Sequence, residues 1–156
     1  RLSAFSLEID TKTYGKISVE CAFQGSKVFE GNIQYNEIYS KTSLEAKKFH
    51  KLNPSGKLIG FKFEEEEWEL EPKSAFYDWL YIKALHPHKD YLKKLFKYDA
   101  FTDIEFNPSK SINCQARTCA IIISLLKRDL YDEVMSSKEN FIDIIYKKQF
   151  KQGTLI

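Results

Sequence analysis

Near the start of the chain the pattern of apolar positions changes from strand-like to helix-like. "FSLEID" (5–10) and "YGKISVE" (14–20) alternate apolar and polar residues on either side of a polar, glycine-containing turn, "TKTYG". This alternation predicts a β-hairpin over residues 5–19 that leads directly into a helix.

The predicted first helix has an unusual polar face. At helical spacing Glu20, Phe23, Gln24 and Lys27 share one side, and the opposite side carries Cys21, Ala22, Gly25, Val28 and Phe29. An ordinary amphipathic helix would bury the second side and expose lysines and glutamates on the first. A phenylalanine and a glutamine on the polar face therefore indicate that this face meets something other than bulk water.

Further along the chain, helix signals outnumber strand signals. We expect a helix capped by Thr42 and Glu45, a strand pair over 57–70 with "EEEE" at its solvent edge or turn, and a helix from Pro72 to residue 85. After these we expect a short helix over 86–98, a strand at 101–106 and a loop at 107–111. The chain should end with a long buried helix over 113–135, broken near Asp129, and a last helix opened by a capping box from Ser136 to Glu139. The fold class is α+β and predominantly helical, with short β-hairpins packed on a helical core.

The length of 156 residues and the hydrophobic content of 43% fit one domain spanning residues 1–156, without repeats or an internal linker. Because the chain does not begin with methionine, we expect an upstream segment to be missing. The longest apolar run, "CAIIISLL", is shorter than the roughly 20 residues of a membrane span and predicts a core helix. The 15% aromatic content is compatible with a packed core, with stacking of flat ligands, or with both.

The formal charge is +2, from 24 basic and 22 acidic residues, which is too small for a protein that coats nucleic acid. A local basic groove stays possible. The lysine clusters at 41, 47, 48 and 51 and at 93, 94 and 97 are interpreted as solvated helix faces.

Three cysteines without an even framework indicate a reducing compartment, and we expect a cytoplasmic protein. Neither the cysteines nor the three histidines have ligand spacing, so we expect no metal and no cofactor.

Two other stretches carry weaker chemistry. Asp103 and Glu105 lie on one face of the predicted strand "TDIEF", where they are either solvated residues or a carboxylate pair for glycosidic hydrolysis. "SINCQART" places Asn113, Gln115 and Arg117 at the start of the long buried helix. There the first turn of the helix could bind an anion such as a phosphate; the alternative is that Ser111 or Asn113 only caps the helix.

The spacing Glu20-x-x-Phe23-Gln24-x-x-Lys27, preceded by "LSAF" (2–5) and followed by "EAKK" (45–48), resembles the NADAR superfamily. "KISVECAFQGSKVFE", "LEPKSAFYDWLYIKAL" and "YDAFTDIEFNPSKSINCQAR" are similar to the branch encoded beside DNA-targeting ADP-ribosyltransferase toxins. The resemblance covers residues 2–145. It implies an N-glycosidase that removes ADP-ribose from guanine in DNA, which would reverse the DNA damage and act as an antitoxin.

The resemblance also implies functional residues. It assigns catalytic roles to Glu20 and Lys27, and substrate contacts to Ser3, Phe5, Phe23, Gln24, Trp68 and Asn113. Ala116 replaces the usual glycine after the family's asparagine, and the Trp-Gly stretch before it has no counterpart, so Asp103 becomes the candidate catalytic group from that region.

These residue types suit cleavage of an N-glycosidic bond. A carboxylate stabilises the positive charge that develops at the anomeric carbon, and a lysine either protonates the leaving base or, when neutral, attacks that carbon to form a Schiff base. Glu20 and Lys27 would lie roughly 10 Å apart along a continuous helix, within reach of one ribose. The alternative for Lys27 is an ordinary surface lysine. The expected partners are ADP-ribosylated DNA, ADP-ribose as product and the cognate toxin, with no membrane. An N-glycosidase of ribosylamino riboflavin intermediates and a non-catalytic ADP-ribose-binding module are the alternatives.

Overall fold

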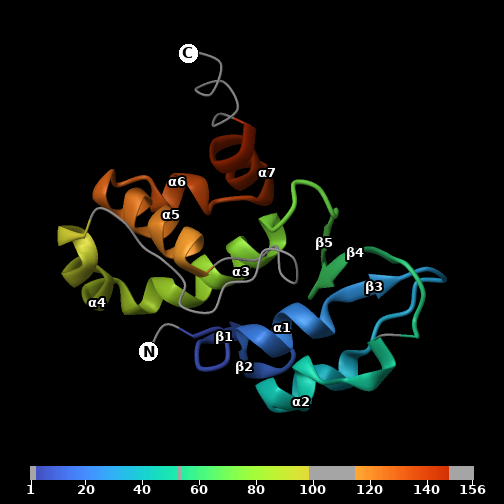
Figure 1. Cartoon of the computed structure of the whole chain (residues 1–156). Coiled ribbons are helices and arrows are strands. Elements are labelled where there is room, and N and C mark those ends of the chain that lie inside the picture. Colours follow the sequence, from blue (N-terminus) through green and yellow to red (C-terminus); the bar gives the residue numbers. More distant parts are fainter. Residues whose placement is uncertain (1–2, 53, 99–114, 148–156) are drawn as a thin grey trace.

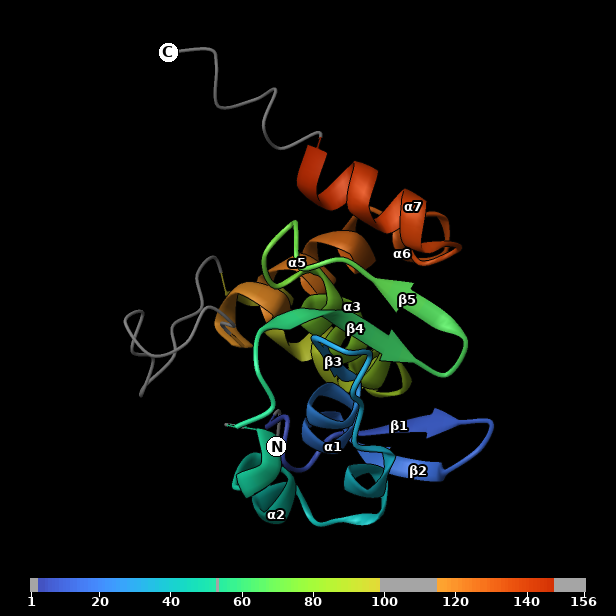
Figure 2. The ribbon, with the colours of Figure 1, turned by 90° about the vertical axis from the view of Figure 1, so that its right-hand side faces the viewer.

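A computed structural model describes residues 3–52, 54–98 and 115–147, and it confirms an α+β fold with two small antiparallel sheets. Helix α3 (Ala75–Leu85) runs through the middle and contacts α1 (Val19–Gly25) on one side and α5 (Gln115–Lys127) on the other (Figure 1). The two small sheets accompany α1, whereas α5, α6 and α7 lie on the other side of α3 (Figure 2).

The predicted N-terminal hairpin is present. Strands β1 (Glu8–Thr11) and β2 (Gly15–Ser18) pair antiparallel, so that Ile9 and Ile17 face each other and are both buried. Gly15 has φ +65°, the left-handed conformation that a tight turn requires and that glycine adopts without strain. The hairpin enters α1 directly, where the Ser18 side chain accepts a hydrogen bond from the Cys21 backbone N–H as an N-cap.

The prediction that one helix carries both Glu20 and Lys27 is wrong. Helix α1 ends at Gly25, and Lys27 is the first residue of strand β3 (Lys27–Phe29). A Cβ at position 25 would lie 2.6 Å from Cε1 of Tyr39, so the buried Tyr39 ring passes directly over the last turn of the helix. Beyond this point the chain pairs with strand β4 (Leu58–Phe63), with Lys27 opposite Phe61.

The predicted second strand pair is also present, and it is part of a larger sheet. Strands β4 and β5 (Glu66–Trp68) pair antiparallel. The first two residues of the acidic run, Glu64 and Glu65, form the turn between them, where Glu64 has φ +54°, and the other two belong to β5. Strand β3 joins on the other edge of β4 to give the order β3-β4-β5. The sequence pattern did not predict β3, because three residues are too few to show an alternation.

The Thr42–Glu45 capping box is confirmed at the start of α2 (Ser43–Lys47). Short 3₁₀ turns flank this helix at Asn36–Ser40 (η1) and His50–Leu52 (η2). After α3 the short helix after a proline break is confirmed as η3 (His86–His88), α4 (Lys89–Lys93) and η4 (Lys94–Lys97).

Two helix starts differ from the prediction. Helix α3 begins at Ala75 instead of Pro72, after Ser74 with φ +65°. The last helix, α7 (Lys138–Ile142), is capped by Ser137, whose side chain accepts from the Asn140 N–H, and not by Ser136. A π-helical turn (η5, Asp143–Lys147) continues from α7.

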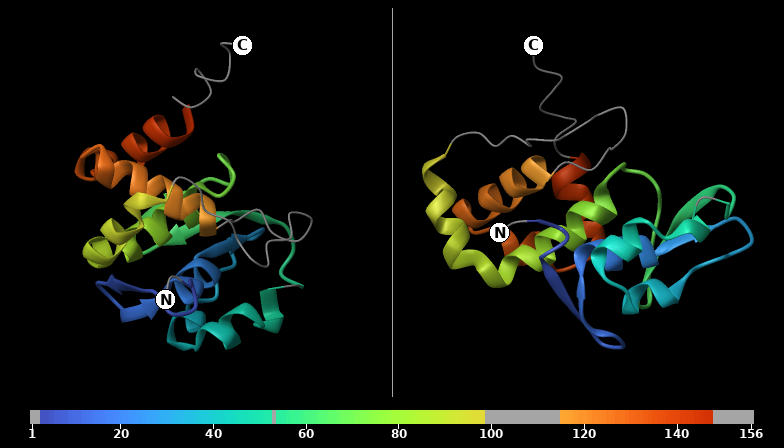
Figure 3. Two further views of the ribbon diagram at one scale, coloured as in Figure 1. Left: turned by 60° about the vertical axis from the view of Figure 1, so that its left-hand side comes forward. Right: turned by 60° about the horizontal axis from the view of Figure 1, so that its bottom comes forward.

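The predicted break in the long C-terminal helix is confirmed. Asp129 has φ +54° and separates α5 from α6 (Tyr131–Val134). The predicted strand at 101–106 and loop at 107–111 lie outside the described residues. Helices α5 to α7 pack together on the side of α3 away from the hairpin (Figure 3). None of the described helices is long and apolar enough to cross a membrane.

Candidate functional site

Glu20 is a buried carboxylate in the first turn of α1. Its side chain is 8% exposed, and Oε1 accepts a hydrogen bond of 3.0 Å from Nε2 of Gln24, one helical turn later. The other end of that amide, Oε1 of Gln24, is buried and has no hydrogen-bond partner among the described residues. Because a buried acceptor without a partner is costly, this oxygen is suited to receive a donor such as a ribose hydroxyl or a base N–H.

Lys27 returns to the same side of α1 although it belongs to β3. Its Nζ lies 5.3 Å from the centroid of the Phe23 ring, within the range of a cation–π contact. Burial lowers the pKa of the Lys27 ammonium group, and the charge of Glu20 only partly offsets this effect. Glu20 and Lys27 form no ion pair in the described part of the chain. The four residues of the Glu-x-x-Phe-Gln-x-x-Lys motif thus lie close together, three of them on helix α1 and Lys27 at the start of strand β3.

Phe23 connects this motif to the rest of the core. Its ring contacts Phe61 of β4 at 5.4 Å, and the edge contact with Tyr77 of α3 is 5.3 Å between centroids. Phe61 and Tyr77 were not predicted as site residues. Each lies in an apolar stretch whose pattern shows only that it is buried.

The Ser3-x-Phe5 element lies against the first turn of α1. Its backbone turns at Ala4, whose carbonyl accepts a 3.2 Å hydrogen bond from the Glu20 N–H. The Ser3 carbonyl accepts from the N–H groups of Ser6 and Leu7, so this serine holds the turn in place. The Phe5 ring is 37% exposed, and Nζ of Lys47 lies 5.1 Å from its centroid.

Phe5 also borders a surface hollow that Glu20, Gln24 and Lys27 do not line. The other walls of this hollow include Tyr14, Ser18, Lys41 and Ser43. The element is therefore adjacent to the helix of Glu20 through its backbone, while its exposed ring faces a separate part of the surface.

Trp68 is not brought to this set of residues. Its side chain is 3% exposed and packs among the rings of Phe76, Trp79 and Phe141, while Nε1 donates to Glu66. The described structure gives this indole a packing role and leaves no free face for a base. The predicted site residues Asp103 and Asn113 lie outside the described residues.

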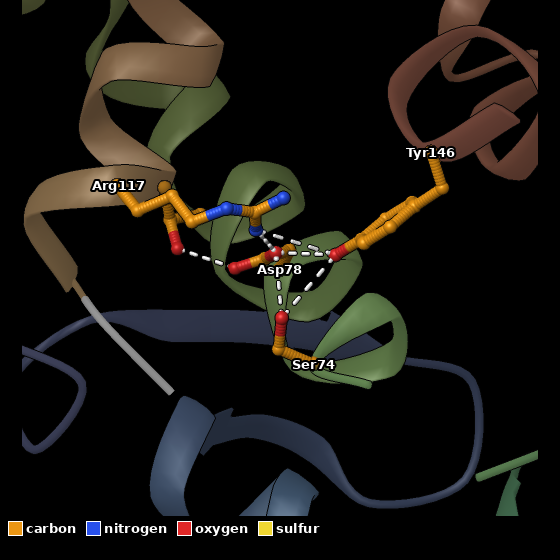
Figure 4. Close-up of polar contacts among 5 residues, drawn as sticks. Ser74, Asp78, Arg117 and Tyr146 are labelled. Atoms are coloured by element: carbon orange, nitrogen blue, oxygen red, sulfur yellow. Dashed lines mark hydrogen bonds and ion pairs between the residues drawn. The ribbon is translucent and has the colours of Figure 1, made fainter. Parts of the chain in front are cut away.

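A second buried carboxylate, Asp78 of α3, was not predicted. Its side chain is 1% exposed and accepts hydrogen bonds from Thr118 Oγ1 at 2.5 Å, Tyr146 OH at 2.5 Å and Ser74 Oγ at 3.2 Å, and it forms an ion pair with Arg117 (Figure 4). Burial and the charge of Asp78 raise the pKa of Tyr146 to about 12. The structure therefore holds Arg117, an anion-binding candidate in the sequence, against Asp78. The sequence did contain a signal for this buried carboxylate, namely an aspartate inside the apolar stretch "SAFYDWLYI".

Among the described residues no group of three histidine, cysteine or acidic side chains could hold a metal ion. The described site offers a carboxylate, an amide, an amine and an aromatic face. Such a set can bind a polar, ring-containing ligand and move protons.

Comparison with known protein families gives a match over nearly the whole chain. The family model NADAR-DarT1, described as DarT1-associated NADAR antitoxin, matches residues 1–154. A comparison with curated proteins finds no match.

Proposed function

Because the chain belongs to the family of DarT1-associated NADAR antitoxins, we propose that it is an N-glycosidase that removes ADP-ribose from guanine bases in DNA. The reaction would reverse the modification made by a DNA ADP-ribosyltransferase toxin and restore the base. Its substrate would be ADP-ribosylated DNA in the cytoplasm, and free ADP-ribose would be the product.

One observation carries this proposal: the buried Glu20 carboxylate is bonded to Gln24, and the desolvated Lys27 amine lies over the ring of the preceding residue, Phe23, near enough to interact with the charge of Glu20. A surface lysine would keep its ordinary pKa, and a solvated glutamate would not be 8% exposed. Lowering the pKa of an amine by burial is a general way to make lysine a nucleophile or a proton carrier near neutral pH.

In the proposed reaction the bond between C1′ of the ribose and the guanine nitrogen breaks. Positive charge develops at C1′, where the Glu20 carboxylate stabilises it, while the leaving nitrogen takes up a proton. Water supplies the hydroxyl group that ends on C1′, so that ADP-ribose and an unmodified guanine are released. The unpaired Oε1 of Gln24 would accept a hydrogen bond from a ribose hydroxyl and so orient the sugar.

Lys27 has two possible roles, which differ in the form of its amine. As an ammonium group it would donate a proton to the leaving base. As a neutral amine it would displace guanine from C1′ and pass a proton to the leaving nitrogen. The C1′–O4′ bond would then open to give an imine between C1′ and Lys27 Nζ, with O4′ taking up a proton, and water would hydrolyse that imine to release ADP-ribose and the free amine. The lowered pKa favours the second role, which predicts that borohydride traps an ADP-ribose adduct on Lys27 during turnover and none on Lys27→Arg. Turnover without any trapped adduct would assign Lys27 to proton donation.

The proposal is tested with a DNA oligonucleotide that carries ADP-ribose on one guanine. We expect the wild-type protein to remove the adduct and Glu20→Gln to be slower by at least about 100-fold, the usual contribution of a positioned acid–base group. Glutamine at position 20 keeps an acceptor for Gln24 Nε2, so the variant should fold normally.

Failure of the folded wild type to remove the adduct would refute the proposal. Cleavage of ribosylamino pyrimidines instead would indicate the metabolite N-glycosidase. ADP-ribose binding that survives in Glu20→Gln, without product from either protein, would indicate a binding module.

A further inference from the structure

The Asp78 network joins three parts of the chain that are far apart in sequence. Asp78 lies in the first turn of α3, Arg117 and Thr118 lie in the first turn of α5, and Tyr146 lies in η5. Ser74, at the start of α3, also donates to this carboxylate (Figure 4). The network therefore fixes where α5 and η5 sit along and around α3.

Stability alone does not explain a buried carboxylate paired with an arginine at this place. Taking a charge out of water is costly, and apolar residues of similar volume often stabilise a core as well as a buried ion pair does. What a fully hydrogen-bonded network adds is a single arrangement, because the directional bonds tolerate little rotation or sliding of the helices.

The neighbouring residue on α3 faces the candidate site. Consecutive helical residues project about 100° apart, so α3 presents Asp78 to α5 and η5 and presents Tyr77 to α1. The Tyr77 ring makes its edge contact with Phe23, and the Phe23 ring carries the Lys27 ammonium group. Phe76, the residue before Tyr77, contacts the same Phe23 ring at 6.3 Å.

We infer that Asp78 is a positioning residue for the candidate site. Its network sets the rotation and register of α3, and α3 in turn holds Tyr77 and Phe76 against Phe23 and so fixes the place of Lys27. Asp78 touches neither Glu20 nor Lys27 and would act only through these rings. The inference rests on the proposed function in one respect, namely that Glu20 and Lys27 form the reactive site.

The test compares two network variants with a control of similar structural cost. Thr118→Val removes one hydrogen bond to Asp78 and keeps the side-chain shape, and Tyr146→Phe removes another. Val134→Ala, fully buried in α6 and without a role in the network, serves as control. For each protein the melting temperature, kcat and KM are measured on the modified oligonucleotide. The pKa of Lys27 is measured by NMR after ¹³C-methylation of lysines, with Lys27→Arg used to assign the signal.

We expect both network variants to raise the pKa of Lys27 toward its ordinary value, because a shifted α3 lets water reach Phe23. We also expect kcat to fall about tenfold with a smaller change in KM, while Val134→Ala changes neither quantity even where it lowers the melting temperature as much. An unchanged Lys27 pKa in both folded network variants, or changes that follow the melting temperature equally in all three proteins, would overturn the inference.

The NMR measurement separates this inference from the proposed function. If the wild type lacks glycohydrolase activity, the proposed function fails, but the Lys27 pKa still decides whether the network positions that residue.

Discussion

Gly25 allows a quantitative test of why helix α1 ends where it does. A Cβ added there would lie 2.6 Å from Cε1 and 2.8 Å from Cδ1 of Tyr39, well inside van der Waals contact. The Tyr39 ring cannot easily retreat, because it is 4% exposed and its hydroxyl lies 3.2 Å from Ser26 Oγ and 3.3 Å from Gln34 Nε2. Gly25→Ala should therefore force a strained core.

The expected cost follows from two opposing terms. Overpacking a core by one methyl group destabilises by about 1–3 kcal/mol, and replacing glycine by alanine in a helix returns up to ~1 kcal/mol. With the middle of the overpacking range, about 2 kcal/mol, the net loss should be about 1–2 kcal/mol in the free energy of unfolding. For a domain of this size that corresponds to a fall in melting temperature of roughly 2–8 °C.

The assay is urea unfolding followed by tryptophan fluorescence, together with calorimetry, in a double-mutant cycle with Tyr39→Ala. When the ring is absent, Gly25→Ala should cost nothing or stabilise the protein, because only the gain in helix propensity remains. An equal loss in both backgrounds would show that the Tyr39 ring is not the reason that α1 ends at Gly25.

Three further predictions concern the candidate site and the buried network. Glu20→Gln should leave the melting temperature within about 1 °C of wild type, since the Gln24 hydrogen bond persists; a large loss of stability would mean that Glu20 is mainly structural. If the neutral amine of Lys27 reacts, kcat/KM should rise with pH and level off below pH 10.5, because burial lowers the pKa of this group from that value; a rate that falls over this range would indicate the ammonium form. Tyr146 keeps its proton up to a pKa of about 12 in the folded state and to about 10 when unfolded, so the free energy of unfolding should fall from pH 10 to 12. Urea midpoints over this range should fall less steeply for Tyr146→Phe; parallel slopes would contradict the buried environment assigned to this tyrosine.

Local elements of the fold could be predicted from the sequence because their causes are local. The β1-β2 hairpin follows from alternation around a glycine turn, and the start of α2 follows from Thr42 and Glu45 three residues apart. The break at Asp129 lies between two helical patterns and was predicted for the same reason. The sequence also identified Glu20, Phe23, Gln24 and Lys27 as one group, and the structure places Gln24 against Glu20 and Lys27 against Phe23.

The end of α1 and the strand that holds Lys27 could not be predicted in this way. Gly25 is limited by Tyr39, and Lys27 pairs with Phe61, both of which are contacts between distant parts of the chain. A periodic pattern carries no information about such contacts, so the helical period was extended too far.

The sequence by itself determined which chemical groups this protein has: a carboxylate, an amide and an amine at a family spacing, and an aspartate inside an apolar stretch. Only the tertiary structure decided what surrounds each of them. It placed Lys27 beside Phe23 from a strand, enclosed Trp68 in the core, and surrounded Asp78 with donors up to 68 residues away. The physical reason is that burial, pKa and hydrogen bonding depend on which surfaces meet, and the meeting of surfaces is settled by packing across the whole chain.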